Sequence, residues 1–179
     1  MALNYTHSPF LVFSSEEERR YVLQQIQKEP INEKAINYGK TYSEELAIGY
    51  EVPSKLVWVS EKIGHGLVSV ENLPPLAYIG EYTGIIGYSC PYFHISNYAY
   101  SYPVTGDCGK QFVVDAERYG NMTRFINHHH QPNLIPVIAY FDNLYHVILI
   151  AGRSIVAGEP FSYNYGDHYW AIRGIPETF

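Results

Sequence analysis

From Lys55 onward the chain is a series of short β-branched or aromatic runs separated by glycine, proline, asparagine and aspartate, and this pattern restricts the fold more than any other feature. The runs read KLVWVS, GLVSV, LAYIGEY, QFVVD, IPVIAYF and YHVILIA. Runs of this length and composition are typical of strands. Because no helical segments alternate with them, a Rossmann-type dinucleotide site is excluded, and we expect a mainly β domain (β-rich α+β) built from small sheets.

The dipeptide Asp142-Asn143 separates the last two of these runs. Both residue types tolerate turn conformations, so the dipeptide predicts a β-hairpin. We expect the β-rich domain to occupy residues 53–169, with a partly helical region of residues 1–52 packed on it and a short C-terminal tail, residues 170–179.

Helical signals lie in the N-terminal region. The segment SSEEERRYVLQQIQKEP predicts a helix with Ser14 and Glu17 as a capping box, an acidic first turn and a stop at Pro30. A weaker helical stretch covers residues 32–47, with an expected interruption at Gly39.

Composition narrows the class of protein. Hydrophobic residues make up 46% and charged residues 17% of the 179 residues, which excludes a disordered chain. The net charge of −6 disfavours sequence-independent binding to nucleic acid and is compatible with a basic polypeptide partner. Two cysteines, Cys90 and Cys108, supply neither a disulfide framework nor a zinc cage. With no visible signal peptide and no apolar run of transmembrane length, the sequence predicts a soluble protein of a reducing cytosol.

The run RFINHHHQPN, residues 124–133, first suggests a metal site. Neighbouring residues point in different directions on a strand or a helix, so His128, His129 and His130 do not converge on one ion without an irregular backbone. The sequence also has no HExxH motif, no two-His-one-carboxylate spacing and no cysteine partner. A polar loop with solvated histidines is the simpler interpretation, and we expect no metal.

Four separated stretches fit together better than any of them alone, namely KIGHGLVS, YIGEYTG, YGNMTRFINHHHQPN and AGEPFSYNYGD, in this order. Together they resemble the SET-domain protein lysine methyltransferases, whose pattern is GxG, EYxGE, RFxNHSCxPN and GEELxYDYG. The resemblance covers residues from about 55 to 169. It implies a SET fold of several small, mostly antiparallel sheets, in which the Asn-His and Tyr-x-Tyr segments form a pseudoknot.

In this family the methyl donor is S-adenosylmethionine, and the product is S-adenosylhomocysteine. The resemblance implies that the GxG loop brings backbone groups close to the cofactor and that the Asn-His segment holds it. Tyr98 falls where the family often has a cofactor-contacting tyrosine. The cofactor-binding residues implied in this way are Ile63, His65, Gly66, Tyr98, Arg124, Phe125, Asn127, His128 and Trp170.

The resemblance assigns the catalytic side chains to three tyrosines. Tyr165 matches the catalytic tyrosine that orients the amine and the donor methyl, Tyr82 matches a channel tyrosine, and Tyr163 matches a position that holds Phe or Tyr. A lysine has a pKa of about 10.4 and attacks only in its neutral form, which costs about 4–5 kcal/mol at neutral pH. An aromatic channel lowers that pKa by desolvation. A hydroxyl at Tyr163 leaves less room for a methylated amine, which predicts mono- or dimethylation.

Two departures from the family pattern agree with each other. His130 replaces the NHSC cysteine, and the tail DHYWAIRGIPETF contains no cysteine. In many members these cysteines bind zinc, so the chain resembles the compact, zinc-free members of bacteria and large DNA viruses. Tyr169 and Trp170 are then the candidates for closing the site by burying aromatic area over it. Glu159, retained from the GEEL motif, is expected to pair with an arginine.

The leading hypothesis is therefore a protein-lysine N-methyltransferase. Its substrate is expected to be an extended basic peptide, most often a histone tail in this family, laid on a sheet edge near residues 98–104. The alternative is a catalytically silent SET-like peptide-binding module, against which the retained Tyr165, Asn127 and His128 count. A histidine-based metal hydrolase lacks both ligand spacing and an identified base. We expect action in the cytoplasm, or in a nucleus if the substrate is a histone.

Overall fold

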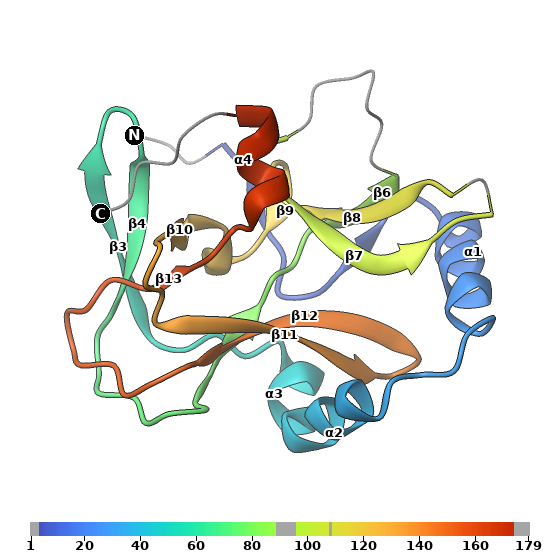
Figure 1. The fold of residues 1–179 in the computed structure, drawn as a ribbon, viewed down its shortest axis with the longest axis horizontal. Coiled ribbons are helices and arrows are strands. Elements are labelled where there is room, and N and C mark those ends of the chain that lie inside the picture. The colour runs from blue at the N-terminus through green and yellow to red at the C-terminus, as the bar shows by residue number, and fades with distance from the viewer. Residues whose placement is uncertain (1–3, 89–95, 108, 174–179) are drawn as a thin grey trace. The chain divides into compact units, whose positions relative to one another are not determined.

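The computed structural model describes residues 4–88, 96–107 and 109–173, so Cys90, Cys108 and most of the expected tail lie outside the described residues. Its many short strands and its few helices confirm the expectation of a mainly β chain with a partly helical N-terminal region (Figure 1). None of the helices in the described part has the length and apolar character of a membrane-spanning segment. In chain order the elements are β1 (Thr6–His7), β2 (Val12–Phe13), α1 (Glu16–Ile26), α2 (Glu33–Thr41), α3 (Ser43–Ile48), β3 (Ser54–Ser60), β4 (Gly64–Ser69), β5 (Tyr78–Glu81), β6 (Ile85–Tyr88), β7 (Ala99–Thr105), β8 (Gln111–Asp115), β9 (Tyr119–Gly120), a 3-10 helix (Met122–Phe125), β10 (Asn127–His128), β11 (Leu134–Phe141), β12 (Leu144–Ala151), β13 (Ser162–Tyr163) and α4 (Asp167–Arg173).

The strands of the described residues form five small sheets. One is four-stranded, in the order β2-β6-β8-β7, and one is three-stranded, in the order β11-β12-β5. The pairs β1-β9, β3-β4 and β10-β13 are two-stranded sheets. Neighbours β3-β4, β6-β8 and β7-β8 are antiparallel, whereas the short pairs β1-β9, β2-β6 and β10-β13 are parallel. Each parallel pair joins segments that are far apart in the sequence.

Strands β11 and β12 form the predicted hairpin. The residues between them, Asp142 and Asn143, both have positive φ angles, 46° and 65°. Two consecutive positive φ angles are what a two-residue type I′ turn requires, and Asn and Asp reach that region more easily than most residues. The local sequence was therefore sufficient to place this turn.

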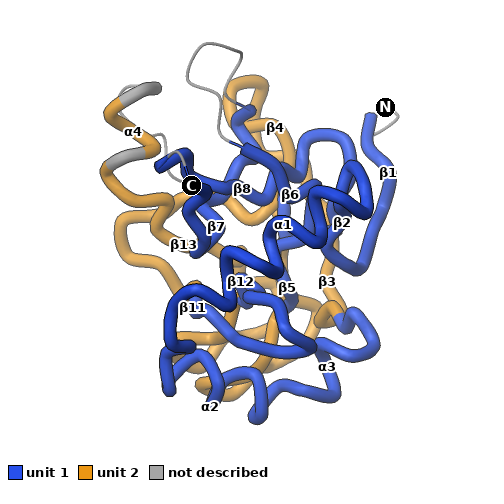
Figure 2. Tube along the Cα trace, turned by 90° about the vertical axis from the view of Figure 1, so that its right-hand side faces the viewer, with its two compact units in different colours: residues 1–50, 80–124, 137–148 blue, residues 51–79, 125–136, 149–179 orange. Residues whose placement is uncertain are grey.

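The chain divides into two compact units, each assembled from segments that are remote in the sequence (Figure 2). Strands β5, β11 and β12 contribute residues to both units. The division into three consecutive parts that the sequence suggested stays a prediction. Unit 1 comprises residues 1–50, 80–124 and 137–148, and unit 2 comprises residues 51–79, 125–136 and 149–179.

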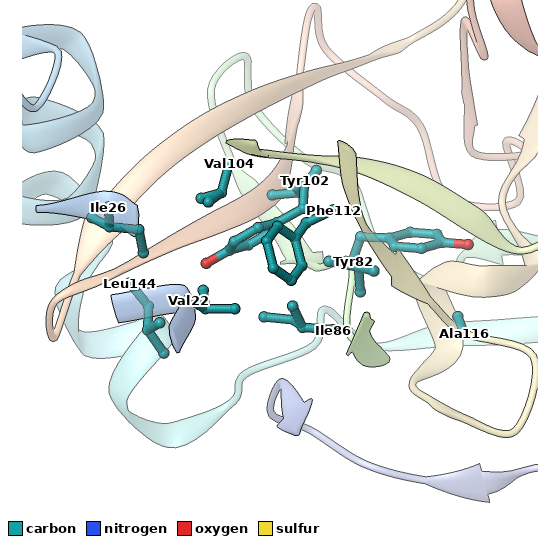
Figure 3. Packing of buried hydrophobic residues seen from close by; sticks show 11 residues of the cluster. Val22, Ile26, Tyr82, Ile86, Tyr102, Val104, Phe112, Ala116 and Leu144 are labelled. Carbon is teal, nitrogen blue, oxygen red and sulfur yellow. The ribbon is translucent and has the colours of Figure 1, made fainter. Parts of the chain in front are cut away.

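The core of unit 1 packs helix α1 against side chains of the four-stranded sheet (Figure 3). Val22 and Ile26 lie one helical turn apart on the same face of α1 and are buried. On β7, Tyr102 and Val104 are buried while Pro103 between them is exposed, as the two-residue period of a strand requires. Burial of side chains of this size contributes about 1.5–3 kcal/mol each. The cluster consists of Val22, Ile26, Tyr82, Ile86, Tyr102, Val104, Phe112, Val114, Ala116, Leu144 and Val147.

Helix α1 begins one residue later than the sequence indicated. Ser15, not Ser14, is the N-cap, and its Oγ accepts the Glu18 N–H at 3.1 Å. The Glu18 carboxylate in turn accepts the Ser14 N–H at 3.2 Å. The N-cap is therefore shifted by one position, because two serines and three glutamates in a row allow two registers. Glu18 accepts the N–H of the residue before the N-cap, whereas in a capping box it would accept the N–H of the N-cap itself.

The predicted interruption at Gly39 is wrong. Helix α2 continues through this residue, and the break between α2 and α3 falls at Tyr42. A β-carbon on Gly39 would lie 1.9 Å from the carbonyl oxygen of Tyr140. The glycine therefore allows close packing of α2 against the β11 backbone and does not end the helix.

Candidate active site

In unit 2 the Asn-His and Tyr-x-Tyr segments lie side by side. Strands β10 and β13 pair in parallel, with Asn127 opposite Ser162 and His128 opposite Tyr163. The His129 N–H extends this pairing by donating to the Tyr163 carbonyl at 3.3 Å. The two segments expected to form the pseudoknot are thus hydrogen-bonded neighbours.

The Asn127 side chain connects the Asn-His segment to strand β4, which carries the GxG motif. Asn127 donates from Nδ2 to the His65 carbonyl at 3.0 Å, and the His65 and Phe125 rings meet edge-on with centroids 6.1 Å apart. Gly64 has a φ of +81°, which favours glycine, and a β-carbon there would meet no atom of the described residues within 4 Å. Three of the predicted cofactor residues, His65, Phe125 and Asn127, are thus in contact, beside a backbone face that no side chain covers in the described part of the chain.

The turn before this strand holds another predicted cofactor residue. Ile63 donates its N–H to Ser60 Oγ at 3.1 Å, which fixes the turn between β3 and β4. Gly66 follows on β4 and is buried. That Ile63 and Gly66 contact the cofactor stays a prediction.

His128 is buried, and its uncharged ring has an N–H group available to donate a hydrogen bond. It is 3% exposed, and its Nδ1 accepts the Tyr165 N–H at 3.1 Å. A neutral imidazole that accepts at Nδ1 carries its proton on Nε2, and this Nε2–H has no hydrogen-bond partner among the described residues. Burial, with smaller contributions from His130 and His129, lowers the pKa of His128, so the ring is uncharged at neutral pH.

The same type of hydrogen bond argues against His128 and His129 as metal ligands. His129 Nδ1 accepts the Gln131 N–H at 2.9 Å, so its neutral ring also carries the proton on Nε2. A metal ion needs a nitrogen lone pair. In both His128 and His129 the Nδ1 lone pair is already used by a backbone N–H, and Nε2 is protonated.

Tyr165 lies within an aromatic cluster. Its hydroxyl donates to the Ile126 carbonyl at 2.8 Å. Its ring centroid lies 4.8 Å from those of Tyr163 and Tyr169, and 6.0 Å from that of Trp170 in a nearly parallel stack. Such ring pairs contribute about 0.5–1.5 kcal/mol beyond their buried area. Helix α4 therefore packs its two aromatic residues on the predicted catalytic tyrosine.

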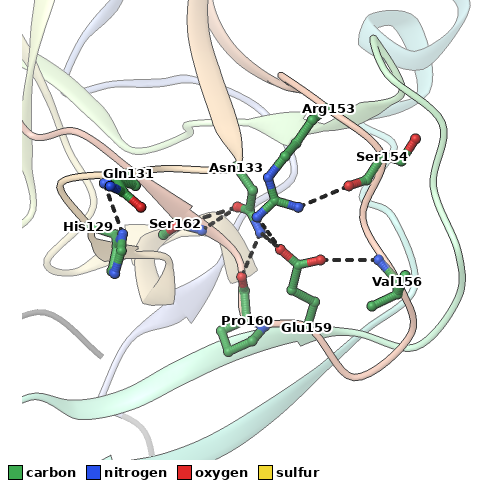
Figure 4. Close-up of polar contacts among 9 residues, drawn as sticks. All are labelled: His129, Gln131, Asn133, Arg153, Ser154, Val156, Glu159, Pro160 and Ser162. Carbon is green, nitrogen blue, oxygen red and sulfur yellow. Dashed lines mark hydrogen bonds and ion pairs between the residues drawn. The ribbon is translucent and has the colours of Figure 1, made fainter.

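A polar junction around Asn133 fixes the start of β13 (Figure 4). Asn133 donates from Nδ2 to Glu159 Oε1 at 2.9 Å and to the Pro160 carbonyl at 2.8 Å, and its Oδ1 accepts the Ser162 N–H at 2.9 Å. Glu159 pairs with Arg153 at 2.5 Å, which confirms the expected arginine partner. The hydrogen bond from Arg153 lowers the pKa of Glu159, so the carboxylate stays charged.

Unit 1 contains the remaining candidates, Tyr82, Tyr98 and Arg124. The Tyr82 hydroxyl donates to the Tyr98 carbonyl at 2.7 Å. The Arg124 guanidinium carbon lies 4.0 Å from the centroid of the Tyr98 ring. The three residues form one connected group, and their roles toward substrate and cofactor stay predictions.

Directly before Tyr82, a buried ion pair appears that the sequence did not predict. Glu81 Oε1 lies 2.8 Å from His146 Nδ1, and His146 Nε2 donates to the Phe141 carbonyl at 3.1 Å. Burial opposes the charged form of the ring, but the Glu81 carboxylate and both hydrogen bonds raise the pKa of His146 above its ordinary value. Both ring nitrogens face acceptors, as expected of a protonated imidazole.

Replacing His146 with glutamine is expected to lower the free energy of unfolding by about 3 kcal/mol at mildly acidic pH, because Glu81 then remains buried without its charged partner. Since the folded-state pKa of His146 is raised, the pair stabilises fully below the ordinary value of about 6.5. This contribution is lost as the pH rises through the folded-state pKa.

Urea unfolding of both proteins across that pH range provides the measurement. The difference in unfolding free energy between wild type and His146→Gln is expected to shrink as the pH rises. His7→Gln, at an exposed histidine of β1, is the control. A difference that is constant or grows with pH would contradict the charged pair.

The sequence did not identify residues whose role depends on a partner that is far away along the chain. Glu81 and Asn133 stand inside the quoted motifs, but no spacing rule identified their partners. His146 had a usable signal, because it is the polar residue inside the otherwise apolar run YHVILIA. A polar side chain in a fully buried strand requires a hydrogen-bond partner.

Comparison with known families identifies the class of protein. The SET domain model matches residues 64–166. The chain therefore belongs to the SET-domain family, which confirms the resemblance read from the four motifs.

Individual relatives agree with this assignment. Histone-lysine N-methyltransferase EHMT1 of Homo sapiens is 33% identical over 116 residues, which cover 63% of this chain and 9% of that protein. Histone-lysine N-methyltransferase SETMAR of Mus musculus is 31% identical over 125 residues, 63% of this chain and 40% of that protein. The chain thus spans less than half the length of either relative.

Solved structures confirm the SET fold. ATXR5 in complex with mono-methylated histone H3.1 superposes with a TM-score of 0.68 at 18% identity, over 92% of this chain and 82% of that chain. The structure of ctPRC2 in an autoinhibited conformation bound to S-adenosylmethionine gives a TM-score of 0.57 at 25% identity, over 75% of this chain and 19% of that chain.

Proposed function

We propose that the chain is an S-adenosylmethionine-dependent protein-lysine N-methyltransferase. The observation that carries the proposal is the parallel pairing of β10 with β13, which connects Asn127, His128, Tyr163 and Tyr165 in one site of unit 2. Family membership supports it, as do the names of the relatives, which are histone-lysine methyltransferases.

Two features of unit 2 suit a bound cofactor. His128 Nε2 and Trp170 Nε1 are buried N–H donors with no partner among the described residues, and their rings lie 5.0 Å apart. Buried donors normally meet an acceptor, and S-adenosylmethionine carries carboxylate, hydroxyl and ring-nitrogen acceptors. Among the residues that the structure describes, none covers one side of Gly64, which leaves room beside the backbone. We assign the cofactor contacts of unit 2 to Ile63, His65, Gly66, Phe125, Asn127, His128 and Trp170, and the sequence motifs assign Tyr98 and Arg124 of unit 1 to the same role.

The cofactor supplies the methyl group, and the chain's own residues orient and desolvate the lysine. The Tyr165 hydroxyl is fixed by the Ile126 carbonyl at 2.8 Å, so it is oriented before the substrate enters. The rings of Tyr163, Tyr169 and Trp170 around it exclude water, which lowers the pKa of an amine and frees its lone pair. Tyr82 is assigned by its motif to the lysine channel.

We propose an extended basic peptide as the substrate, with histone tails as the first candidates. Strand β7 lies at the edge of the four-stranded sheet that the described residues form, and the Tyr98 carbonyl accepts the Ala116 N–H. In the regular register from Ala99 to Ser101, the odd-numbered residues then turn their backbone groups outward, so Ser101 offers both of its groups to an added strand. The net charge of −6 suits a basic partner, and the partner in the ATXR5 structure is histone H3.1. With a histone substrate the protein acts in a nucleus, and otherwise in the cytoplasm.

Transfer of labelled methyl from S-adenosylmethionine to a panel of histones and ribosomal proteins tests the proposal. We expect labelling of lysine in at least one basic protein, with mass spectrometry identifying the residue. Binding of cofactor or peptide without transfer to any panel member would favour the silent peptide-binding module. Activity that a chelator removes and zinc restores would favour a metal-dependent enzyme instead.

The degree of methylation provides a further prediction. Tyr163 is 5% exposed, and its ring lies 4.8 Å from that of Tyr165, which supports assigning its hydroxyl to the space next to the reacting amine. We expect wild type to stop at mono- or dimethyl-lysine and Tyr163→Phe to accumulate trimethyl-lysine, with a first-methylation rate within about fivefold of wild type.

A mass-spectrometric time course on the labelled substrate measures this shift in product. Tyr169→Phe removes a hydroxyl from another ring in contact with Tyr165 and is expected to keep the wild-type product distribution. Rapid, processive trimethylation by wild type would refute the assigned role of the Tyr163 hydroxyl.

A further inference from the structure

In unit 1 the Arg124 side chain is held between two aromatic rings. Its guanidinium carbon lies 4.5 Å from the centroid of the Tyr5 ring and 4.0 Å from that of the Tyr98 ring. The guanidinium edge is occupied by main-chain acceptors, because Nε donates to the Ala116 carbonyl at 2.8 Å and an Nη donates to the Glu117 carbonyl at 3.3 Å. Because these hydrogen bonds fix the edge of the guanidinium, its flat faces are available to the rings of Tyr5 and Tyr98.

Tyr5 is itself fixed by the small sheet β1-β9. The Thr6 N–H donates to the Arg118 carbonyl at 2.8 Å, and Thr6 is paired with Tyr119. The Tyr5 hydroxyl also lies 3.6 Å from Met122 Sδ as a donor. The ring that contacts Arg124 therefore comes from the residue directly before strand β1, outside residues 64–166, the part that matches the family model.

On the other side of Arg124, the main chain of Tyr98 is held by three hydrogen bonds. Its carbonyl accepts the Tyr82 hydroxyl at 2.7 Å and the Ala116 N–H at 3.1 Å, and its N–H donates to Ser96 Oγ at 3.0 Å. Its ring is not held by these bonds; it packs against the hydrophobic cluster of unit 1 and stacks on Arg124. An aromatic ring that loses such a contact regains rotamer freedom, which must be lost again when a ligand binds.

We propose that Tyr5 is a positioning residue that acts through Arg124 to hold the Tyr98 ring in its cofactor-binding orientation. The inference rests on the proposed function, in which Tyr98 contacts S-adenosylmethionine. It assigns a role in the site to the N-terminal segment that leads into β1. The effect is expected on cofactor affinity, because Tyr5 reaches the Tyr98 ring through Arg124, whereas the Tyr82 hydroxyl bonds the Tyr98 carbonyl and does not depend on that ring.

The test uses the full chain with three substitutions and measures S-adenosylmethionine binding by calorimetry together with KM for the cofactor and kcat. Tyr5→Leu removes the ring and is expected to raise Kd and KM about five- to tenfold, with kcat within about twofold. Tyr5→Phe keeps the ring and is expected to restore wild-type values. Tyr119→Leu removes an exposed ring from the same small sheet and is expected to leave all three constants unchanged.

Three results would overturn the inference while the proposed function stands. They are equal cofactor affinity of Tyr5→Leu and wild type, an equal loss in Tyr119→Leu, and failure of Tyr5→Phe to restore affinity. A wild-type chain that neither binds the cofactor nor transfers methyl would instead overturn the proposed function, and the inference with it. The wild-type titration therefore distinguishes the two failures.

Discussion

Tyr165→Phe is expected to reduce kcat for methyl transfer by about 100-fold or more, the usual cost of removing one preorganised polar group from a catalytic site. The hydroxyl is oriented by the Ile126 carbonyl at 2.8 Å, so its loss removes a group that is already in position. The ring itself remains packed against Tyr163, Tyr169 and Trp170. We therefore expect the fold and the cofactor affinity to be retained.

Single-turnover methyl transfer at saturating cofactor measures this effect, with calorimetry reporting S-adenosylmethionine binding. Tyr169→Phe is the matched control, because it removes a hydroxyl from a ring in contact with Tyr165 and is expected to change kcat by less than about threefold. Activity of Tyr165→Phe within about tenfold of wild type would show that the hydroxyl is not required. A parallel loss of cofactor affinity would indicate a structural role instead.

Features of the fold that depend on local chemistry were predictable from the sequence. Asp142 and Asn143 favour the positive φ angles that close the β11-β12 hairpin, and strand composition identified β3, β8 and β12. The two-residue strands β1 and β2 were missed because nothing local specifies them. They exist through parallel pairing with Tyr119 and Ile85, which lie more than 70 residues further along the chain.

The same distinction applies to the candidate site. The motifs identified Asn127, His128 and Tyr165, because the family pattern preserves residue type and order. They did not reveal that Tyr5 stacks on Arg124 or that Glu81 pairs with His146. Those contacts join residues on separate strands, and many arrangements of the strands are compatible with the local sequence.

A stability effect as large as that of His146→Gln is expected at Asn133, whose substitution by leucine should lower the free energy of unfolding by about 3 kcal/mol. The side chain is 2% exposed and satisfies both the Pro160 carbonyl and the Ser162 N–H. Leucine has a similar size but no polar atoms, and each buried polar group left unpaired costs about 1–3 kcal/mol. Glu159 keeps Arg153 and the Val156 N–H as partners, so the loss falls on the backbone that leads into β13.

Urea unfolding measures this loss, and Gln131→Leu is the matched control. It makes the same amide-to-leucine change two residues away at an exposed position, where we expect an effect within about 0.5 kcal/mol. Because β13 carries Tyr163 and leads to Tyr165, the Asn133→Leu protein is also expected to transfer methyl more slowly at temperatures where it remains folded. Equal midpoints for the two variants would mean that the backbone around Pro160 and Ser162 finds other partners, and the Asn133 junction would then not be what holds the Tyr-x-Tyr segment beside the Asn-His segment.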